Sequence, residues 1–195
     1  TDENGCSDTV TVEITENEPV TVSEEHSNYA EYGVSCKNET DGFINLTTTG
    51  GTETYTYDWT DQDGNAVTPN DQGNLENIGA GTYTAVVTDE NGCSDTVTVE
   101  ITEPEIGVEV TEEHSDYTGA GVSCNGQTDG FINLTATGGT ETYTYDWTDQ
   151  DGNTVTANDQ GNLENIGAGT YTAVVTDENG CSDTVTVEIT ENEPV

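Results

Sequence analysis

Oxygen-bearing side chains gather on two short glycine turns, residues 61–65 and 149–153, which both read DQDGN. Aspartate and asparagine on alternate residues place hard oxygen ligands on one tight loop, and Ca²⁺ prefers such ligands. The glycine stands fourth rather than sixth, so neither turn is an EF-hand. The candidate ligands are Asp61, Asp63, Asn65 and Asp71 in the first copy, and Asp149, Asp151, Asn153 and Asp159 in the second. A plain Asp-Gly turn without metal is the alternative.

A GVSC motif and an NGC motif alternate along the chain and supply five cysteines. Cys36 and Cys93 are 57 residues apart, and so are Cys124 and Cys181. We predict that these two pairs form disulfides, with the partner of Cys6 outside the chain. The alternative pairs Cys6 with Cys36 and Cys93 with Cys124. Either pairing indicates an oxidising, extracellular compartment.

No catalytic constellation emerges from the sequence. The two histidines, His26 and His114, both lie in the sequence EEHS, where a solvated pair with a neighbouring Glu is expected. No spacing of Ser, His and Asp indicates a nucleophile with its base, and no glycine loop is of the phosphate-binding type. We therefore predict a non-enzymatic protein.

The chain is strongly acidic, with 40 Asp and Glu residues against a single basic residue, Lys37, and a net charge of −39. Nucleic-acid binding requires Lys and Arg to neutralise phosphates, so this composition excludes it. Anionic membrane surfaces are disfavoured for the same reason. Dissolved salt screens repulsion between carboxylates, which indicates salty or Ca²⁺-containing surroundings, as in halophilic or marine proteins. The sequence contains no apolar run long enough to span a membrane.

The elements that position these residues belong to a tandem array. The segment TDENGCSDTVTVEITE starts at Thr1, Thr88 and Thr176, and residues 41–103 differ from residues 129–191 at three positions. We predict that residues 1–18 are the C-terminal strand of a preceding repeat. Residues 19–104 form a complete repeat, and residues 105–195 form a second one with the start of the next joint. Prolines in the short joints favour a semi-rigid rod of repeats within a longer parent chain.

Each repeat reads as a series of strands. Val97, Val99 and Ile101 alternate with polar residues, as do Tyr83, Ala85 and Val87, and this period of two is typical of half-buried strands. Glycine turns separate the runs, and an Asn-Gly pair at residues 91–92 predicts a hairpin. About seven strands in 87 residues predict an all-β fold of tandem immunoglobulin-like sandwiches. Trp59 is expected in the core, and Tyr83 is expected as a corner tyrosine.

The order VSC, DGFINL, GGTETYTYDW, GAGTYTAVVTDENGC resembles the SprB repeat, and these motifs occur in both complete units. Proteins of that family are giant surface adhesins of gliding Bacteroidota, typically exported by the type IX system. The segment at residues 59–75 is longer and more acidic than the usual hairpin of the family.

The resemblance implies a structural repeat in the stalk or filament of a very large secreted adhesin, which mediates attachment, gliding or prey capture. Its expected partners are neighbouring repeats and other rods in a homo-oligomeric filament, with other parts of the protein reaching a surface or glycan target. The alternative is a Ca²⁺-dependent glycan-binding module repeated along the chain, with the Tyr/Trp hairpin in contact with the sugar.

Overall fold

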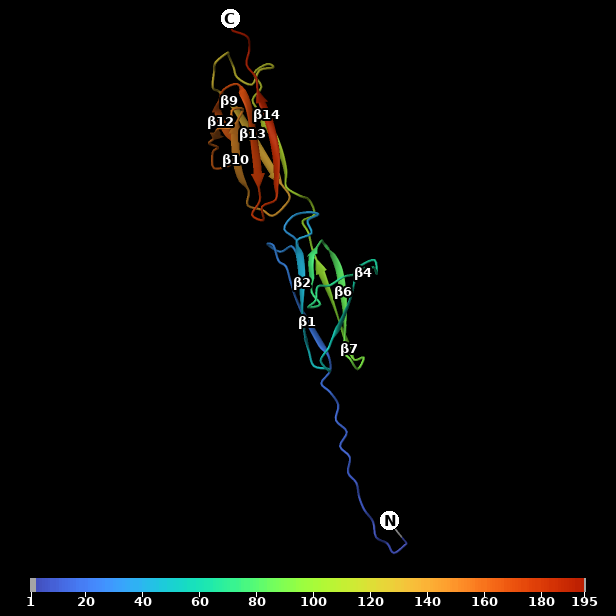
Figure 1. Cartoon of the computed structure of the whole chain (residues 1–195). Coiled ribbons are helices and arrows are strands. Elements are labelled where there is room, and N and C mark those ends of the chain that lie inside the picture. The colour runs from blue at the N-terminus through green and yellow to red at the C-terminus, as the bar shows by residue number, and fades with distance from the viewer. Residues whose placement is uncertain (1–2, 195) are drawn as a thin grey trace.

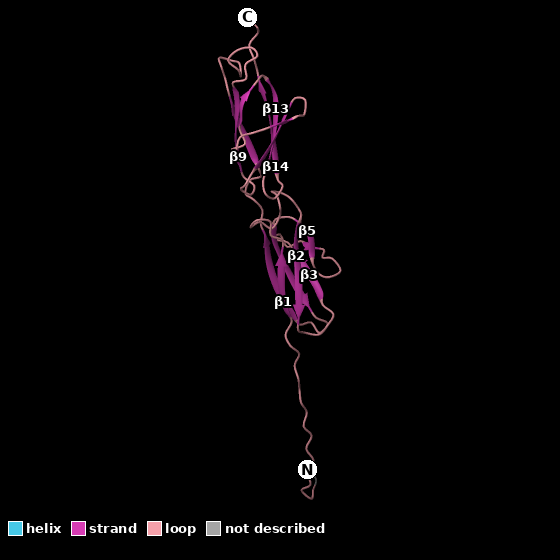
Figure 2. Ribbon diagram, turned by 90° about the vertical axis from the view of Figure 1, so that its left-hand side faces the viewer, coloured by secondary structure: helices cyan, strands magenta, loops and turns pink. Residues whose placement is uncertain are grey.

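The computed structural model describes residues 3–194, which hold fourteen strands and no helix (Figure 2). The strands fall into two sets of seven that repeat each other. The first unit has β1 (Thr21–His26), β2 (Gly42–Thr49), β3 (Thr56–Thr60), β4 (Ala66–Val67), β5 (Leu75–Ile78), β6 (Gly81–Thr88) and β7 (Ser94–Ile101). The second unit has β8 (Glu109–His114), β9 (Gly130–Thr137), β10 (Thr144–Asp149), β11 (Thr154–Val155), β12 (Leu163–Ile166), β13 (Gly169–Thr176) and β14 (Ser182–Ile189).

Each unit is a sandwich of two antiparallel sheets. In the first unit, β1, β2 and β5 form one sheet, and β4, β3, β6 and β7 form the other. The second unit has the same strand orders, with β8, β9 and β12 facing β11, β10, β13 and β14. The longest ladder of the first unit pairs β6 with β7 from Gly81 opposite Ile101 to Thr88 opposite Ser94, and β13 pairs with β14 in the same way. The predicted immunoglobulin-like, all-β architecture is confirmed.

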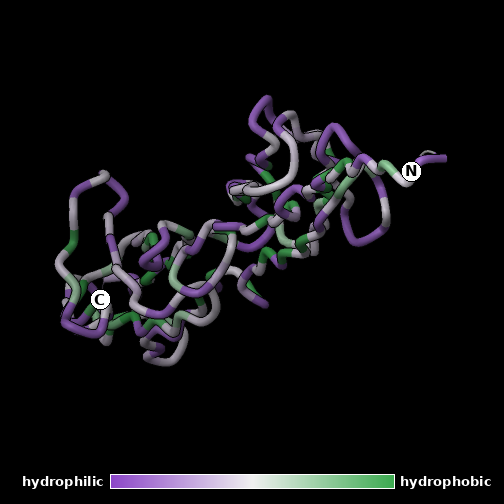
Figure 3. Tube along the Cα trace, turned by 90° about the horizontal axis from the view of Figure 1, so that it is seen from below, coloured by the Kyte–Doolittle hydropathy of each residue, from purple (hydrophilic) through white to green (hydrophobic). Residues whose placement is uncertain are grey.

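The alternating residues fill the space between the sheets. Trp59 is 2% exposed and lies with Ala85, Val99 and Ile101 in one apolar cluster, so its predicted place in the core is confirmed. The indole Nε1–H donates to the carbonyl oxygen of Gly73 at 2.8 Å. A buried indole N–H needs such a partner, because an unpaired donor costs about 1–3 kcal/mol. The second unit repeats the cluster around Trp147, and Figure 3 shows the apolar segments within each unit and hydrophilic loops around them.

One turn type recurs three times in the first unit, at residues 61–65, 70–74 and 89–93. The first residue donates its N–H to the fifth residue's carbonyl oxygen, and the Gly in fourth place donates to the first residue's carbonyl oxygen. Those glycines, Gly64, Gly73 and Gly92, have φ between 81° and 84°, which a residue with a Cβ rarely adopts. The side-chain oxygen of the first residue accepts two more backbone N–H groups. An Asp or Asn followed by Gly three residues later therefore forms a turn whose hydrogen bonds lie within the same five residues.

The first copy of the repeated strand sequence does not form a strand. Residues 6–20 have no ladder partner, and Val10, Val12 and Ile14 are 85%, 74% and 92% exposed. The same sequence forms β7 and β14, where Val99 and Val187 are buried. Those copies pair with β6 and β13, whereas no strand between residues 3 and 194 pairs with residues 6–15. No strand forms between residues 3 and 18, and the assignment of residues 1–18 to a preceding repeat stays a prediction; Thr1 and Asp2, like Val195, lie outside the described residues.

The two units lie end to end, and the described ends of the chain lie at opposite ends of the long axis (Figure 1). The loop between β1 and β2 lies at the end of the first unit that faces the second. The hairpin turn between β13 and β14 lies at the end of the second unit that faces the first. These two segments meet at the junction.

Candidate functional site: the junction between the units

The loop between β1 and β2 presents Cys36 to the second unit. Backbone N–H groups of Gly33 and Val34 donate to the carbonyl oxygen of Thr102 at 2.9 and 3.2 Å, which fixes the loop to the end of β7. The N–H of Ser35 donates to the Asp41 carboxylate at 3.0 Å. Gly33 has no room for a side chain, because a Cβ there would lie 2.7 Å from Ile101. The loop is thus held rigidly by its own unit.

The turn between β13 and β14 presents Cys181 and is organised by Asp177, which is 5% exposed. One carboxylate oxygen accepts the N–H groups of Asn179 and Cys181 at 3.0 and 2.9 Å. The other accepts the N–H of Thr140 at 2.8 Å and its hydroxyl at 3.0 Å. Four donors converge on one carboxylate, which offsets the cost of burying it.

Cys36 and Cys181 form a disulfide across the junction, with their Cα atoms 5.7 Å apart and a sequence separation of 145. It is the one disulfide within the described residues. Cys93 and Cys124 are exposed thiols, and Cys6 is also exposed. The bond therefore joins the GVSC loop of one unit to the NGC turn of the next unit along the chain.

Both predicted pairings were wrong, and the strand directions explain why. Within a unit, the GVSC loop lies where β7 ends, whereas the NGC turn lies at the start of β7, eight residues away. Eight residues of strand span about 26 Å, and a disulfide requires Cα atoms within about 7 Å. Cys36 therefore cannot reach Cys93 in a folded unit, nor can Cys124 reach Cys181. The alternative pairs, Cys6 with Cys36 and Cys93 with Cys124, are also absent.

Polar contacts surround the bond. The side-chain amide of Asn179 donates to the Tyr29 carbonyl oxygen of the first unit at 3.3 Å and to the Thr140 hydroxyl at 2.8 Å. Lys37, next to Cys36, donates from Nζ to the backbone carbonyl oxygen of Glu105 in the joint. The only Lys or Arg of this protein therefore lies on the loop that faces the second unit.

A shallow groove beside the junction is lined by residues of both units, including Glu31, Glu141 and Glu178. Nothing between residues 3 and 194 gathers three His, Cys, Asp or Glu side chains in a geometry that could hold a metal ion. The groove therefore marks the contact between the units, and its carboxylates do not form a cation-binding site.

The candidate calcium ligands lie in the turns described above. Asp61 uses one oxygen to accept the N–H groups of Asp63 and Asn65 at 2.9 and 2.8 Å, and the Asn65 side-chain amide donates to both oxygens. These bonds, led by the Asn65 side chain, lower the pKa of Asp61. Asp149 has the same contacts with Asp151 and Asn153. Asp71 and Asp159 belong to the next turn of each unit. Calcium binding at these residues stays a prediction.

The other residues singled out from the sequence have structural contacts. His26 Nδ1 lies 2.8 Å from a Glu24 oxygen, and both side chains are partly exposed, as His114 and Glu112 are in the second unit. The Tyr83 hydroxyl donates to the Gly79 carbonyl oxygen at 3.0 Å, four residues upstream, which confirms the corner tyrosine.

Sequence reasoning missed the residues that build the junction, chiefly Asp177, Thr140 and Asn179. Their first-unit equivalents, Asp89, Thr52 and Asn91, have similar bonds. Backbone N–H groups, above all that of Thr52, lower the pKa of Asp89. The available signal was the recurrence of the sequence DENGC, which places an aspartate four residues before every NGC cysteine.

Comparisons with known proteins agree with this description. The family model described as SprB repeat matches residues 34–64 and 121–152. Each match lies in one immunoglobulin-like unit, in agreement with the resemblance that the motifs carry. None of the curated proteins matches the chain. Across residues 3–194, no helix is long and apolar enough to cross a membrane.

The chain is similar to several solved structures, two of which consist of tandem Ig domains. The N-terminal eight Ig domains of Down Syndrome Cell Adhesion Molecule share 15% identity over 88% of this chain and 25% of that one, with a TM-score of 0.42. The insect immune protein hemolin shares 17% sequence identity over 77% of this chain and 42% of that one, with a TM-score of 0.35. The tandem Ig repeats of Dlar share 12% sequence identity over 90% of this chain and 98% of that one, with a TM-score of 0.32. The chain thus spans a quarter of the first of these structures and less than half of the second.

Proposed function

We propose that the chain is a segment of the stalk or filament of a very large secreted adhesin, which holds an attachment, gliding or prey-capturing part away from the cell. The SprB repeats and the immunoglobulin-like fold suggest a cell-surface adhesin-type repeat in the extracellular space. The role is mechanical and non-enzymatic.

The observation that carries this proposal is the disulfide between Cys36 and Cys181. It links neighbouring units rather than stabilising either one alone, so its effect is to maintain their end-to-end arrangement. Asn179 adds a hydrogen bond across the same junction, and Lys37 bonds the joint segment beside it. A spacer under tension requires continuity between units, whereas a row of independent binding modules does not.

The test of location is antibody labelling of intact cells that produce the parent protein. Antibodies raised against the folded chain are expected to label the cell surface, and external protease is expected to remove the signal. Labelling that appears only after the cells are opened contradicts the proposal. An antibody against a cytoplasmic protein serves as the control for cell integrity.

A second function, Ca²⁺-dependent glycan binding, is favoured by one groove in the second unit. Tyr143, Tyr145 and the candidate ligand Asp159 line it together. Aromatic rings beside a carboxylate could contact a sugar and a bound cation. Titration of the chain with glycans, with and without EDTA, separates the functions: saturable binding that EDTA abolishes supports the module, and no binding supports the spacer.

A further inference from the structure

The two units provide a natural comparison, because equivalent residues are covered at the junction and uncovered at the outer ends. Cys181 is 8% exposed against the first unit, whereas its equivalent Cys93 is exposed. On the other side of the junction, Cys36 is half-buried, whereas its equivalent Cys124 is exposed. Each outer end therefore presents one half of the contact that is complete in the middle.

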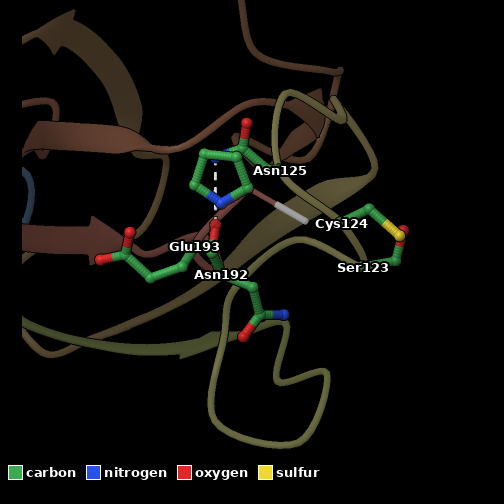
Figure 4. Close-up of a pocket in the computed structure, with 6 residues that line it drawn as sticks. Ser123, Cys124, Asn125, Asn192 and Glu193 are labelled. Atoms are coloured by element: carbon green, nitrogen blue, oxygen red, sulfur yellow. Dashed lines mark hydrogen bonds between the residues drawn. The ribbon is translucent and has the colours of Figure 1, made fainter.

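The outer end of the second unit has the same backbone contacts as the first unit's side of the junction. We call this surface, built by residues 121–125 and 190–192, the socket. Gly121 and Val122 donate to the carbonyl oxygen of Thr190 at 2.8 and 3.2 Å, as Gly33 and Val34 donate to Thr102. Asn125 holds the following segment through the Asn192 carbonyl oxygen at 3.0 Å, in the place where Lys37 holds Glu105. Figure 4 shows the pocket at this end, which Cys124, Asn125 and Asn192 help to line.

The outer end of the first unit has the same turn that the second unit brings to the junction. We call this surface, built by Thr52 and residues 89–93, the plug. Asp89 accepts the N–H groups of Asn91 and Cys93 at 3.0 and 2.8 Å, and that of Thr52 at 2.9 Å. The Asn91 side-chain amide donates to the Thr52 hydroxyl at 2.5 Å. These bonds match those of Asp177 and Asn179 at the junction, so the turn is already folded without a neighbour.

We propose that the outer end of the second unit is a docking surface for the outer end of the first unit of another copy, and that a Cys124–Cys93 disulfide closes it. Residues 1–20 and 176–195 are identical, so one copy can continue into the next through the same joint sequence. In the reaction, two thiols lose two protons and two electrons to a disulfide oxidant such as oxidised glutathione, which becomes two glutathione thiols.

The contact differs from the central junction on the side of the GVSC loop, because residues 116–127 differ from residues 28–39 at seven positions. Tyr32 and Lys37 are replaced by Ala120 and Asn125 in the second unit. The plug keeps every residue of the Asp-Glu-Asn-Gly-Cys turn. The disulfide and the Asn91 amide are therefore expected to form the new junction, as their equivalents do at the central one.

The test uses a tandem chain in which residues 21–195 follow Val195 without a linker, with Cys6→Ser to remove the tail thiol. The tandem folds in a glutathione redox buffer and is then digested without reduction, and mass spectrometry identifies its disulfides. Cys124 of the first copy is expected to be bonded to Cys93 of the second. The Cys36–Cys181 bond in both copies reports correct folding.

Thiol counting gives an independent readout. The tandem has eight cysteines, so three disulfides leave two thiols for maleimide, whereas the two Cys36–Cys181 bonds alone leave four. Cys124→Ser in the first copy is the matched control and is expected to raise the count from two to three. Four thiols, Cys124 bonded to Cys93 of its own copy, or loss of the Cys36–Cys181 bond overturns the proposal. The proposed surface role survives a missing Cys124–Cys93 bond, because the Cys36–Cys181 bond on which it rests is unaffected and a stalk can also be joined without covalent bonds.

Discussion

Reduction of the Cys36–Cys181 bond should multiply the length to which the chain can be stretched. The bond closes a loop with a sequence separation of 145, and its ends lie 5.7 Å apart. A fully extended residue spans about 3.5 Å, so the loop withholds roughly 500 Å of contour length. In the oxidised chain, only the 35 residues before Cys36 and the 14 after Cys181 can extend, or about 170 Å.

Single-molecule force spectroscopy, with handles at the two ends of the chain, measures both lengths directly. The oxidised chain should stop at the shorter length, with only β1 and β14 pulled out of their sheets, because the disulfide carries the tension past the residues between the cysteines. After reduction, or in Cys181→Ser, two further unfolding steps should release the remaining length. Cys93→Ser is the control, and its extension should match that of the oxidised chain. An oxidised chain that extends by the full length refutes the assignment of the bond.

The remaining predictions concern stability. Loss of the disulfide through Cys36→Ser should lower the free energy of unfolding by at most about 5 kcal/mol in the loop-entropy description, measured by urea denaturation. Trp147→Phe removes the donor to the Gly161 carbonyl oxygen, which is 2.8 Å from Nε1, and should cost about 1–3 kcal/mol; an unchanged urea midpoint contradicts this. Hydrogen bonds lower the pKa of Asp61 and Asp89 in the folded state, so their stabilisation is present above pH ~4 and lost as pH falls through the lowered pKa values. Urea midpoints in high salt should therefore fall on acidification below about pH 4, and a rise contradicts the reasoning. If Ca²⁺ binds the DQDGN turns, millimolar Ca²⁺ should raise Tm relative to EDTA, and Asp63→Asn with Asp151→Asn should remove the rise; a Tm that ignores Ca²⁺ in the unsubstituted chain rejects the site.

The strands and turns could be read from the sequence because their causes are local. Alternation at Val97, Val99 and Ile101 places apolar side chains on one face of β7, and the glycine at position 92 permits the hairpin. The same alternation at Val10, Val12 and Ile14 produces no strand, because strand formation also requires a neighbour with free backbone groups. Periodicity therefore predicts which face of a strand is buried, but not whether its partner is present.

The junction could not be predicted from the same signals. The spacing of 57 between Cys36 and Cys93 suggested a pair, yet spacing contains no information about the end of the sandwich to which each loop projects. That depends on the path of β2 to β6 through two sheets. The contact between Cys181 and Cys36 also depends on how one unit is placed against the next, which the path of the strands within a unit does not determine.

Each unit has its GVSC cysteine at one end and its NGC cysteine at the other, so a unit has two different ends and the units join head to tail. Recombination between near-identical repeats can add or delete whole units of a gene. Because every unit brings one half of each linkage, such a change leaves the internal couplings matched. Array length can thus vary over evolution without a compensating substitution.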